Sequence, residues 1–127
     1  MKIVLLLTGG ALGTLARYAL AGYTYKVYSG TFPLGTLIVN LVGSFIIGLL
    51  WGISEGSKIS PNYRAFAFIG LLGGFTTFSS LALDTMNLIR VNAIRHAAIN
   101  MLATNILGLI LVFAGFFIAR EIINLIK

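Results

Sequence analysis

The chain has 127 residues, of which 58% are hydrophobic and only 9% are charged, and its mean hydropathy is +1.00. Because a soluble domain carries about 25% charged residues, this composition predicts an all-α membrane protein with about four spans of ~20 residues and excludes a sizeable soluble domain. The absence of cysteine excludes disulfides. Although the net charge is +6, the chain has no basic soluble face of the kind that nucleic-acid binding requires.

The hydropathy pattern predicts a single transmembrane domain of four helices over residues 1–127. Short polar connections separate the four spans, which lie at about 3–21, 34–53, 65–89 and 97–119. The first span lacks a small-residue cleavage site after a short apolar core, so we expect a retained helix and not a removed signal peptide. The connection over residues 22–33 contains tyrosine and lysine side chains that suit the membrane interface.

Two polar side chains lie inside the first two spans. An arginine as deep as Arg17 is costly in hydrocarbon, so its side chain either faces a protein interior or water-filled recess, or reaches back to the nearby interface. Asn40 lies at mid-membrane depth in the second span, where its amide can both donate and accept hydrogen bonds. It either lines a pore or forms a hydrogen bond between helices.

The third span contains a polar segment within its apolar sequence, GLLGGFTTFSSL over residues 70–81. Adjacent glycines and hydroxyl side chains are costly in hydrocarbon unless neighbouring groups or an ion satisfy the freed polar groups. We therefore predict a broken third helix with a binding or conduction site at the break. Hydroxyl donors suit an anion, whereas exposed carbonyls suit a cation. The hydroxyl side chains are those of Thr76, Thr77, Ser79 and Ser80.

An aromatic ring and a carboxylate lie in the same span. The electropositive edge of the Phe78 ring is able to contact an anion, although a phenylalanine in a membrane helix more often faces lipid or the core. Asp84 is the only carboxylate within a span. It either belongs to the site or pairs with a basic residue near the same surface, such as Arg90.

A polar stripe follows in the fourth span. Asn100, Thr104 and Gly108 recur at i, i+4 and i+8, which places them on one face of a helix. Opposite the break in the third span, such a stripe would complete a polar path. The alternative is hydrogen bonding between helices.

The positive charges of the loops are nearly balanced across the expected membrane. One side carries five, Lys2, Lys58, Arg64, Arg120 and Lys127. The other side carries Lys26, Arg90 and Arg95, with Arg17 as a fourth if it reaches that interface. Because positive charge in short loops sets orientation, this balance favours dual topology with antiparallel pairing, and a single weakly biased orientation is the alternative. Two further features favour a dimer. A bundle of four helices can hardly enclose an aqueous path by itself, and the glycines on every span permit close helix packing.

Catalysis is not expected. The sequence has one histidine, no cysteine, no closely spaced pair of carboxylates and no metal-ligand spacing. The alternatives are a channel, a small dual-topology multidrug transporter and a non-conducting assembly protein. A proton-coupled transporter needs an intramembrane carboxylate, for which Asp84 is the sole candidate, and an assembly protein leaves the clustered hydroxyls unexplained. These considerations favour the channel.

The motifs together resemble the Fluc or CrcB family of small prokaryotic fluoride channels. The resemblance covers nearly the whole chain through GGALGTLARY, PLGTLIVNLVGSFIIG, GLLGGFTTFSS and NMLATNILG, one motif from each span. It implies a dual-topology antiparallel homodimer in the prokaryotic plasma (inner) membrane, whose partners are a second copy of the chain, fluoride and the lipid bilayer. It also implies two narrow pores that export fluoride passively and relieve its toxicity.

The resemblance implies roles for individual residues as well. A structural Na⁺ at the dimer centre is held by the backbone carbonyls of Gly73 and Thr76. The ring-edge contacts to fluoride fall on Phe78 and Leu81, but leucine stands where the family usually has phenylalanine and offers no electropositive edge. Asp84 stands where the family commonly has glutamate. The other pore positions are Asn40 at the pore mouth and, along the polar track, Thr77, Ser79, Ser80, Thr104 and Asn100, the last where an aromatic hydroxyl is often found.

Overall fold

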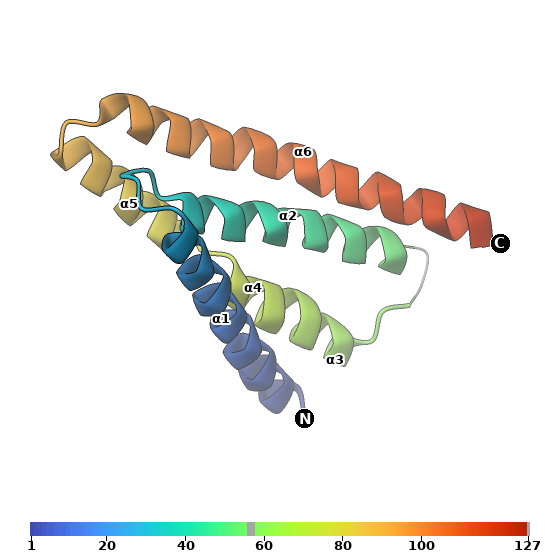
Figure 1. Ribbon diagram of the computed structural model, residues 1–127. Helices are drawn as coiled ribbons and strands as arrows, with labels where there is room; N and C mark the ends of the chain where they lie inside the picture. The colour runs from blue at the N-terminus through green and yellow to red at the C-terminus, as the bar shows by residue number, and fades with distance from the viewer. Residues whose placement is uncertain (56–57, 127) are drawn as a thin grey trace.

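The computed structural model describes residues 1–55 and 58–126, and this part of the chain contains helices and no strand (Figure 1). Four helical segments are long and apolar enough to cross a membrane: Lys2–Val27, Leu34–Ser54, Pro61–Arg90 and Ile94–Ile126. The prediction of an all-helical protein with four apolar spans is therefore confirmed. The first, second and fourth segments are the helices α1, α2 and α6.

The helices α1 and α6 continue beyond the apolar spans that the sequence predicts. α1 runs to Val27, through the tyrosine-rich sequence that we assigned to a connection, and α6 ends only at Ile126. Hydropathy locates the edge of the hydrocarbon, whereas a helix continues until its backbone is interrupted, which for α1 happens before Gly30 and Pro33. The 33 residues of α6 extend about 50 Å, more than the ~30 Å of a hydrocarbon core.

The third segment is made of several pieces: α3 (Pro61–Tyr63), the π-helix η1 (Arg64–Leu72), α4 (Gly73–Phe75) and α5 (Phe78–Arg90). It starts at Ser60, whose Oγ accepts a hydrogen bond from the Tyr63 N–H at 3.1 Å. Between α4 and α5, Thr76 and Thr77 are extended, with φ/ψ of −80°/157° and −152°/115°. These two residues are called the Thr76–Thr77 link below.

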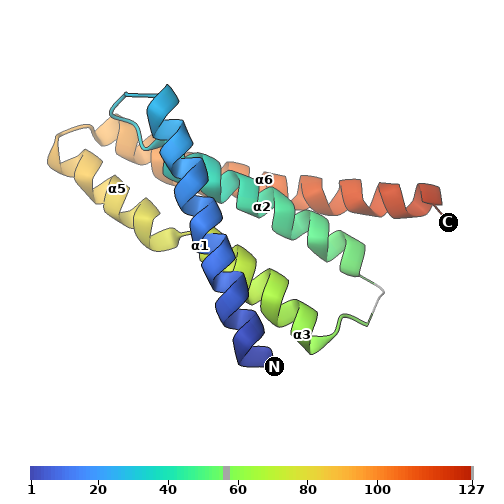
Figure 2. The ribbon, with the colours of Figure 1, turned by 60° about the horizontal axis from the view of Figure 1, so that its bottom comes forward.

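Two close helix contacts position this link. α2 and α6 run side by side, while α1 crosses η1 and α4 (Figures 1 and 2). A Cβ at Gly48 of α2 would overlap the backbone carbonyl of Val112 on α6, and a Cβ at Gly13 of α1 would overlap that of Leu71. Glycine at both positions therefore allows the helix backbones to touch. Packing within one chain accounts for these two glycines.

Several of the buried apolar side chains lie close to the link in the chain or on the neighbouring helix. Val39 of α2, Phe75 of α4 and Leu81 of α5 are 1%, 8% and 2% exposed. Most other large apolar side chains face outward along all four segments, as expected for helices that meet hydrocarbon or another copy of the chain. The polar segment therefore has buried apolar side chains beside it.

Candidate functional site

The Thr77 side chain caps the helix that follows the link. Its Oγ1 accepts a hydrogen bond from the Ser80 N–H at 3.2 Å, which satisfies one of the free donors at the start of α5. The same oxygen lies 3.0 Å from Ser80 Oγ and 3.3 Å from Ser79 Oγ. Three of the four predicted hydroxyl residues are therefore brought together. The fourth, Thr76, instead donates to the carbonyl of Leu72, the last residue of η1, at 2.9 Å.

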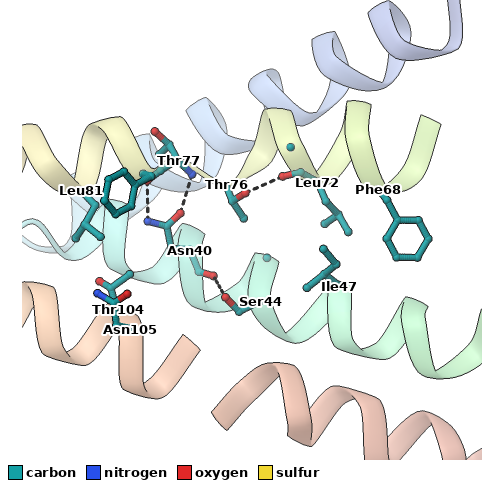
Figure 3. Close-up of a pocket in the computed structure, with 13 residues that line it drawn as sticks. Asn40, Ser44, Ile47, Phe68, Leu72, Thr76, Thr77, Leu81, Thr104 and Asn105 are labelled. Carbon is teal, nitrogen blue, oxygen red and sulfur yellow. Dashed lines mark hydrogen bonds between the residues drawn. The ribbon is translucent and has the colours of Figure 1, made fainter. Parts of the chain in front are cut away.

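The Asn40 side chain binds the backbone of Thr77 from α2 (Figure 3). Asn40 Oδ1 accepts from the Thr77 N–H at 2.8 Å, and Asn40 Nδ2 donates to the Thr77 carbonyl at 3.0 Å. Both residues are buried, with 8% and 9% of their surface exposed. Asn40 therefore forms the hydrogen bond between helices that was one of its two alternatives.

Asn40 also lines a cavity of about 370 Å³ on one side of the link, called the Phe78 recess below. Phe78, Leu81 and Thr104 line it too, and Figure 3 shows Asn40, Thr77, Leu81 and Thr104 around it. Phe78 is 71% exposed, whereas Leu81 is 2% exposed. The two residues expected to make ring-edge contacts thus differ in environment as well as in type. The accessible ring belongs to Phe78.

A second cavity of about 480 Å³, the Arg17 recess, lies between α1, α2 and α5. It is lined by the half-buried Arg17 and by Ser80 and Asp84, as well as by Thr77. The Asp84 carboxylate accepts a hydrogen bond from Thr36 Oγ1 at 2.6 Å. Within residues 1–55 and 58–126, the ion pair that forms is Glu55 with Arg120, so Asp84 does not pair with Arg90. The recess thus holds one cationic and one anionic side chain, with hydroxyls between them at the depth of the link.

The polar stripe of α6 is divided between two environments. Thr104 lines the Phe78 recess and donates to the Asn100 carbonyl at 2.8 Å. Asn100 is completely buried and lines neither recess, and its Nδ2 donates to Thr85 Oγ1 at 3.1 Å. Its Oδ1 has no hydrogen-bond partner among the described residues. Ser79 is exposed, and within the described part of the chain its hydroxyl bonds to the site through Thr77 Oγ1.

The residues expected to hold a cation both line the Phe78 recess. Gly73 is exposed, and a Cβ there would meet only the Phe68 carbonyl, at 3.9 Å. Thr76 is extended, so its carbonyl departs from the helix direction. Oxygen dipoles of backbone carbonyls bind monovalent cations, so two residues of one recess that include an extended residue fit such an ion.

Sequence reasoning missed two residues of this site that a simple pattern reveals. Thr36, Asn40 and Ser44 recur at i, i+4 and i+8 on α2, the same spacing as the stripe in the fourth span. Thr36 binds Asp84, and Ser44 Oγ donates to the Asn40 carbonyl at 2.7 Å. No sequence pattern indicates Thr85. Its role follows from a contact between two helices, the hydrogen bond that it accepts from the buried Asn100.

Comparison with known proteins agrees with these features. The chain matches the family model described as CrcB-like protein, Camphor Resistance (CrcB), over residues 4–116. A Parabacteroides distasonis protein named fluoride-specific ion channel FluC is 49% identical over 127 residues, which cover 100% of this chain and 99% of the relative. Proteins of the same name from Desulforapulum autotrophicum and Agrobacterium fabrum are 42% and 40% identical, over 95% and 96% of this chain and 98% of each relative.

The family match agrees with the four apolar helices, which make the protein a multi-pass membrane protein. The relatives are named as ion channels, so the expectation that the chain is not an enzyme agrees with its family. The match also extends over most of the chain and includes all four sequence motifs. The chain therefore belongs to the CrcB family, as the resemblance of its motifs predicts.

Proposed function

We propose that this protein is a fluoride-selective channel that exports F⁻ passively across the prokaryotic plasma (inner) membrane and thereby relieves fluoride toxicity. The observation that carries the proposal is the position of the Thr76–Thr77 link. Its hydroxyl groups lie within a membrane span, and recesses lined by Phe78 and by Arg17 adjoin it. The names of the relatives supply the identity of the ion.

Fluoride is small and strongly hydrated, so a selective pore has to replace its water with closely spaced donors. Ser80 Oγ accepts from Thr77 Oγ1 and so keeps its own O–H for the ion, whereas the hydroxyls of Thr77 and Thr104 donate to the ion by turning away from Ser80 Oγ and the Asn100 carbonyl. The edge of the exposed Phe78 ring provides a partial positive charge. Arg17 attracts anions to its side of the recess, because a partly desolvated cation acts strongly at short range, while Asp84 in the same recess offsets part of this attraction. Chloride is larger and is excluded by a narrow pore.

The functional unit is an antiparallel homodimer with two pores and dual topology. Two observations support this part of the proposal. The loop charges are nearly balanced between the two ends, and Phe78, next to the polar link, is 71% exposed in a single chain. A second copy would cover this exposed side of the Phe78 recess. A structural Na⁺ at the dimer centre would be held by the carbonyls of Gly73 and Thr76, and its charge would raise the local potential for anions.

The direct test is an efflux assay on purified protein in liposomes. Fluoride release, followed with an ion-selective electrode, is expected to be far faster than chloride release from matched liposomes. Liposomes without protein provide the background leak. Equal release of the two halides would contradict the proposed selectivity, and release no faster than the background would contradict conduction itself.

A second prediction concerns the position at which this chain departs from the family. Leu81→Phe is expected to preserve fluoride flux or to raise it by up to about tenfold. The new ring edge adds an anion contact that we take to be of the same order as an aromatic pair, up to about 1.5 kcal/mol, and the adjacent recess of about 370 Å³ gives the ring space. The efflux assay above measures the change. A complete block would contradict the assignment of this side chain to the pore wall.

A further inference from the structure

We propose that Asn40 is the positioning residue of the channel, which acts on the ion through the backbone of Thr77. This inference rests on the proposed function for its effect on conduction, but the contact itself is independent of that function. An extended residue within a membrane span leaves its N–H and carbonyl without helical partners, at a cost of several kcal/mol for each unsatisfied group. Both groups of Thr77 are satisfied by one amide, at 2.8 and 3.0 Å.

The position of α2 brings this amide to the link. Ser44 Oγ donates to the backbone carbonyl of Asn40 one turn along α2, a bond within the helix that leaves the amide to Thr77. Gly43 lies on the same side of α2, where a Cβ would overlap Thr76 Cγ2. The helix therefore lies directly against the link and presents the amide to Thr77. A side chain that only donated to a passing ion would not need both its donor and its acceptor committed to one peptide unit.

The position of Thr77 explains why its orientation matters. Thr77 lines both the Phe78 recess and the Arg17 recess, and the lining residues of the two cavities have no other residue in common. Thr77 is thus the residue that an ion would meet in either recess, and its Oγ1 lies 3.0 Å from Ser80 Oγ. If the Thr77 backbone turns, these hydroxyls lose their alignment.

The first test measures the contact without any transport. In protein labelled with ¹⁵N-threonine, Asn40→Ser is expected to increase the hydrogen exchange of the Thr77 N–H by about tenfold, the factor that corresponds to about 1.4 kcal/mol. The Thr76 N–H binds the Leu72 carbonyl and serves as the internal control. Unchanged exchange at Thr77 would overturn the proposal, whether or not the protein conducts fluoride.

The second test separates positioning from direct contact with the ion. A protonated carboxyl has one donor and one acceptor, so Asn40→Asp restores both bonds to Thr77 only at acidic pH, and no N–H remains for an ion. We expect at least a tenfold loss of fluoride flux at alkaline pH and recovery toward the wild-type flux at acidic pH. The leak of protein-free liposomes is subtracted at each pH, because HF crosses lipid. Arg17 and Asp84 are the charged groups of the recess beside Thr77. Wild-type flux is measured at the same pH values, so that any pH effect of these groups is separated from that of the new carboxyl.

The outcomes of the second test are distinct. If Asn40→Asp regains wild-type Thr77 exchange at acidic pH but not flux, the amide contacts the ion directly, and the positioning role is overturned. Asn105→Asp is the matched control, because Asn105 lines the same recess but donates to Met101 of its own helix at 2.7 Å. It is expected to leave Thr77 exchange unchanged. A wild-type protein that conducts no fluoride would contradict the proposed function, and the exchange test would still decide the contact.

Discussion

Phe78→Ile is expected to lower fluoride flux by roughly three- to tenfold without unfolding the protein. An aromatic pair, in which the electropositive edge of one ring meets the negative face of another, contributes about 0.5–1.5 kcal/mol, and we take the contact of a ring edge with an anion to be of the same order. About 1.4 kcal/mol in a barrier is a factor of ten in rate. Isoleucine retains the apolar character of the side chain but has no electropositive edge. Because Phe78 is 71% exposed in one chain, its loss leaves no cavity in the core of that chain. Fluoride efflux from liposomes measures the effect.

The control for this prediction is a phenylalanine in a comparable exposed setting. Phe117 of α6 is 60% exposed, lines neither recess and stacks against Phe113 with the ring centroids 6.3 Å apart. Phe117→Ile is expected to leave fluoride flux at the wild-type level. If Phe78→Ile also conducted at that level, the ring-edge contact would be wrong, and the pore would depend on hydroxyl donors alone.

The membrane spans were predictable because hydropathy depends on local sequence. The second span, expected over residues 34–53, agrees closely with α2 (Leu34–Ser54). The ends of α1 and α6 were not predictable in the same way, because interfacial turns rich in tyrosine, lysine and arginine are compatible with both helix and connection. Where such a long helix ends depends on where its backbone is interrupted, and hydropathy does not report that position.

The arrangement of the site was predictable only in part. The sequence marks Asn40 and the hydroxyls near Thr77 as polar groups that need partners, but the pairing of one amide with one peptide unit depends on how α2 lies against the link. The stripe of the fourth span shows the same limit. Helical spacing places Asn100 and Thr104 on one face, yet Thr104 meets the Phe78 recess while Asn100 is buried against Thr85. A shared face does not specify which neighbour each residue contacts.

Gly48→Ala is expected to have a large effect on stability, because α2 carries both the contact with α6 and the amide that binds Thr77. A single methyl group at Gly48 would overlap the Val112 backbone, which has no flexible end that moves aside. Relief requires α2 and α6 to separate, at a cost of about 1–3 kcal/mol in the free energy of unfolding. The fluorescence of Trp51, the single tryptophan, reports this change from the next turn of α2 during denaturation in micelles.

The matched control for Gly48→Ala is Gly22→Ala in α1, where a Cβ has nothing within 4 Å. Alanine at an open helical position is neutral or stabilises by up to about 1 kcal/mol, because glycine loses more conformational freedom on folding. The two variants add the same methyl group, so the difference between their unfolding midpoints isolates the helix contact from helix propensity. Loss of stability in Gly48→Ala should also speed Thr77 hydrogen exchange, since Asn40 moves with α2. Equal midpoints would contradict the role of the α2–α6 contact in holding Asn40 against the link.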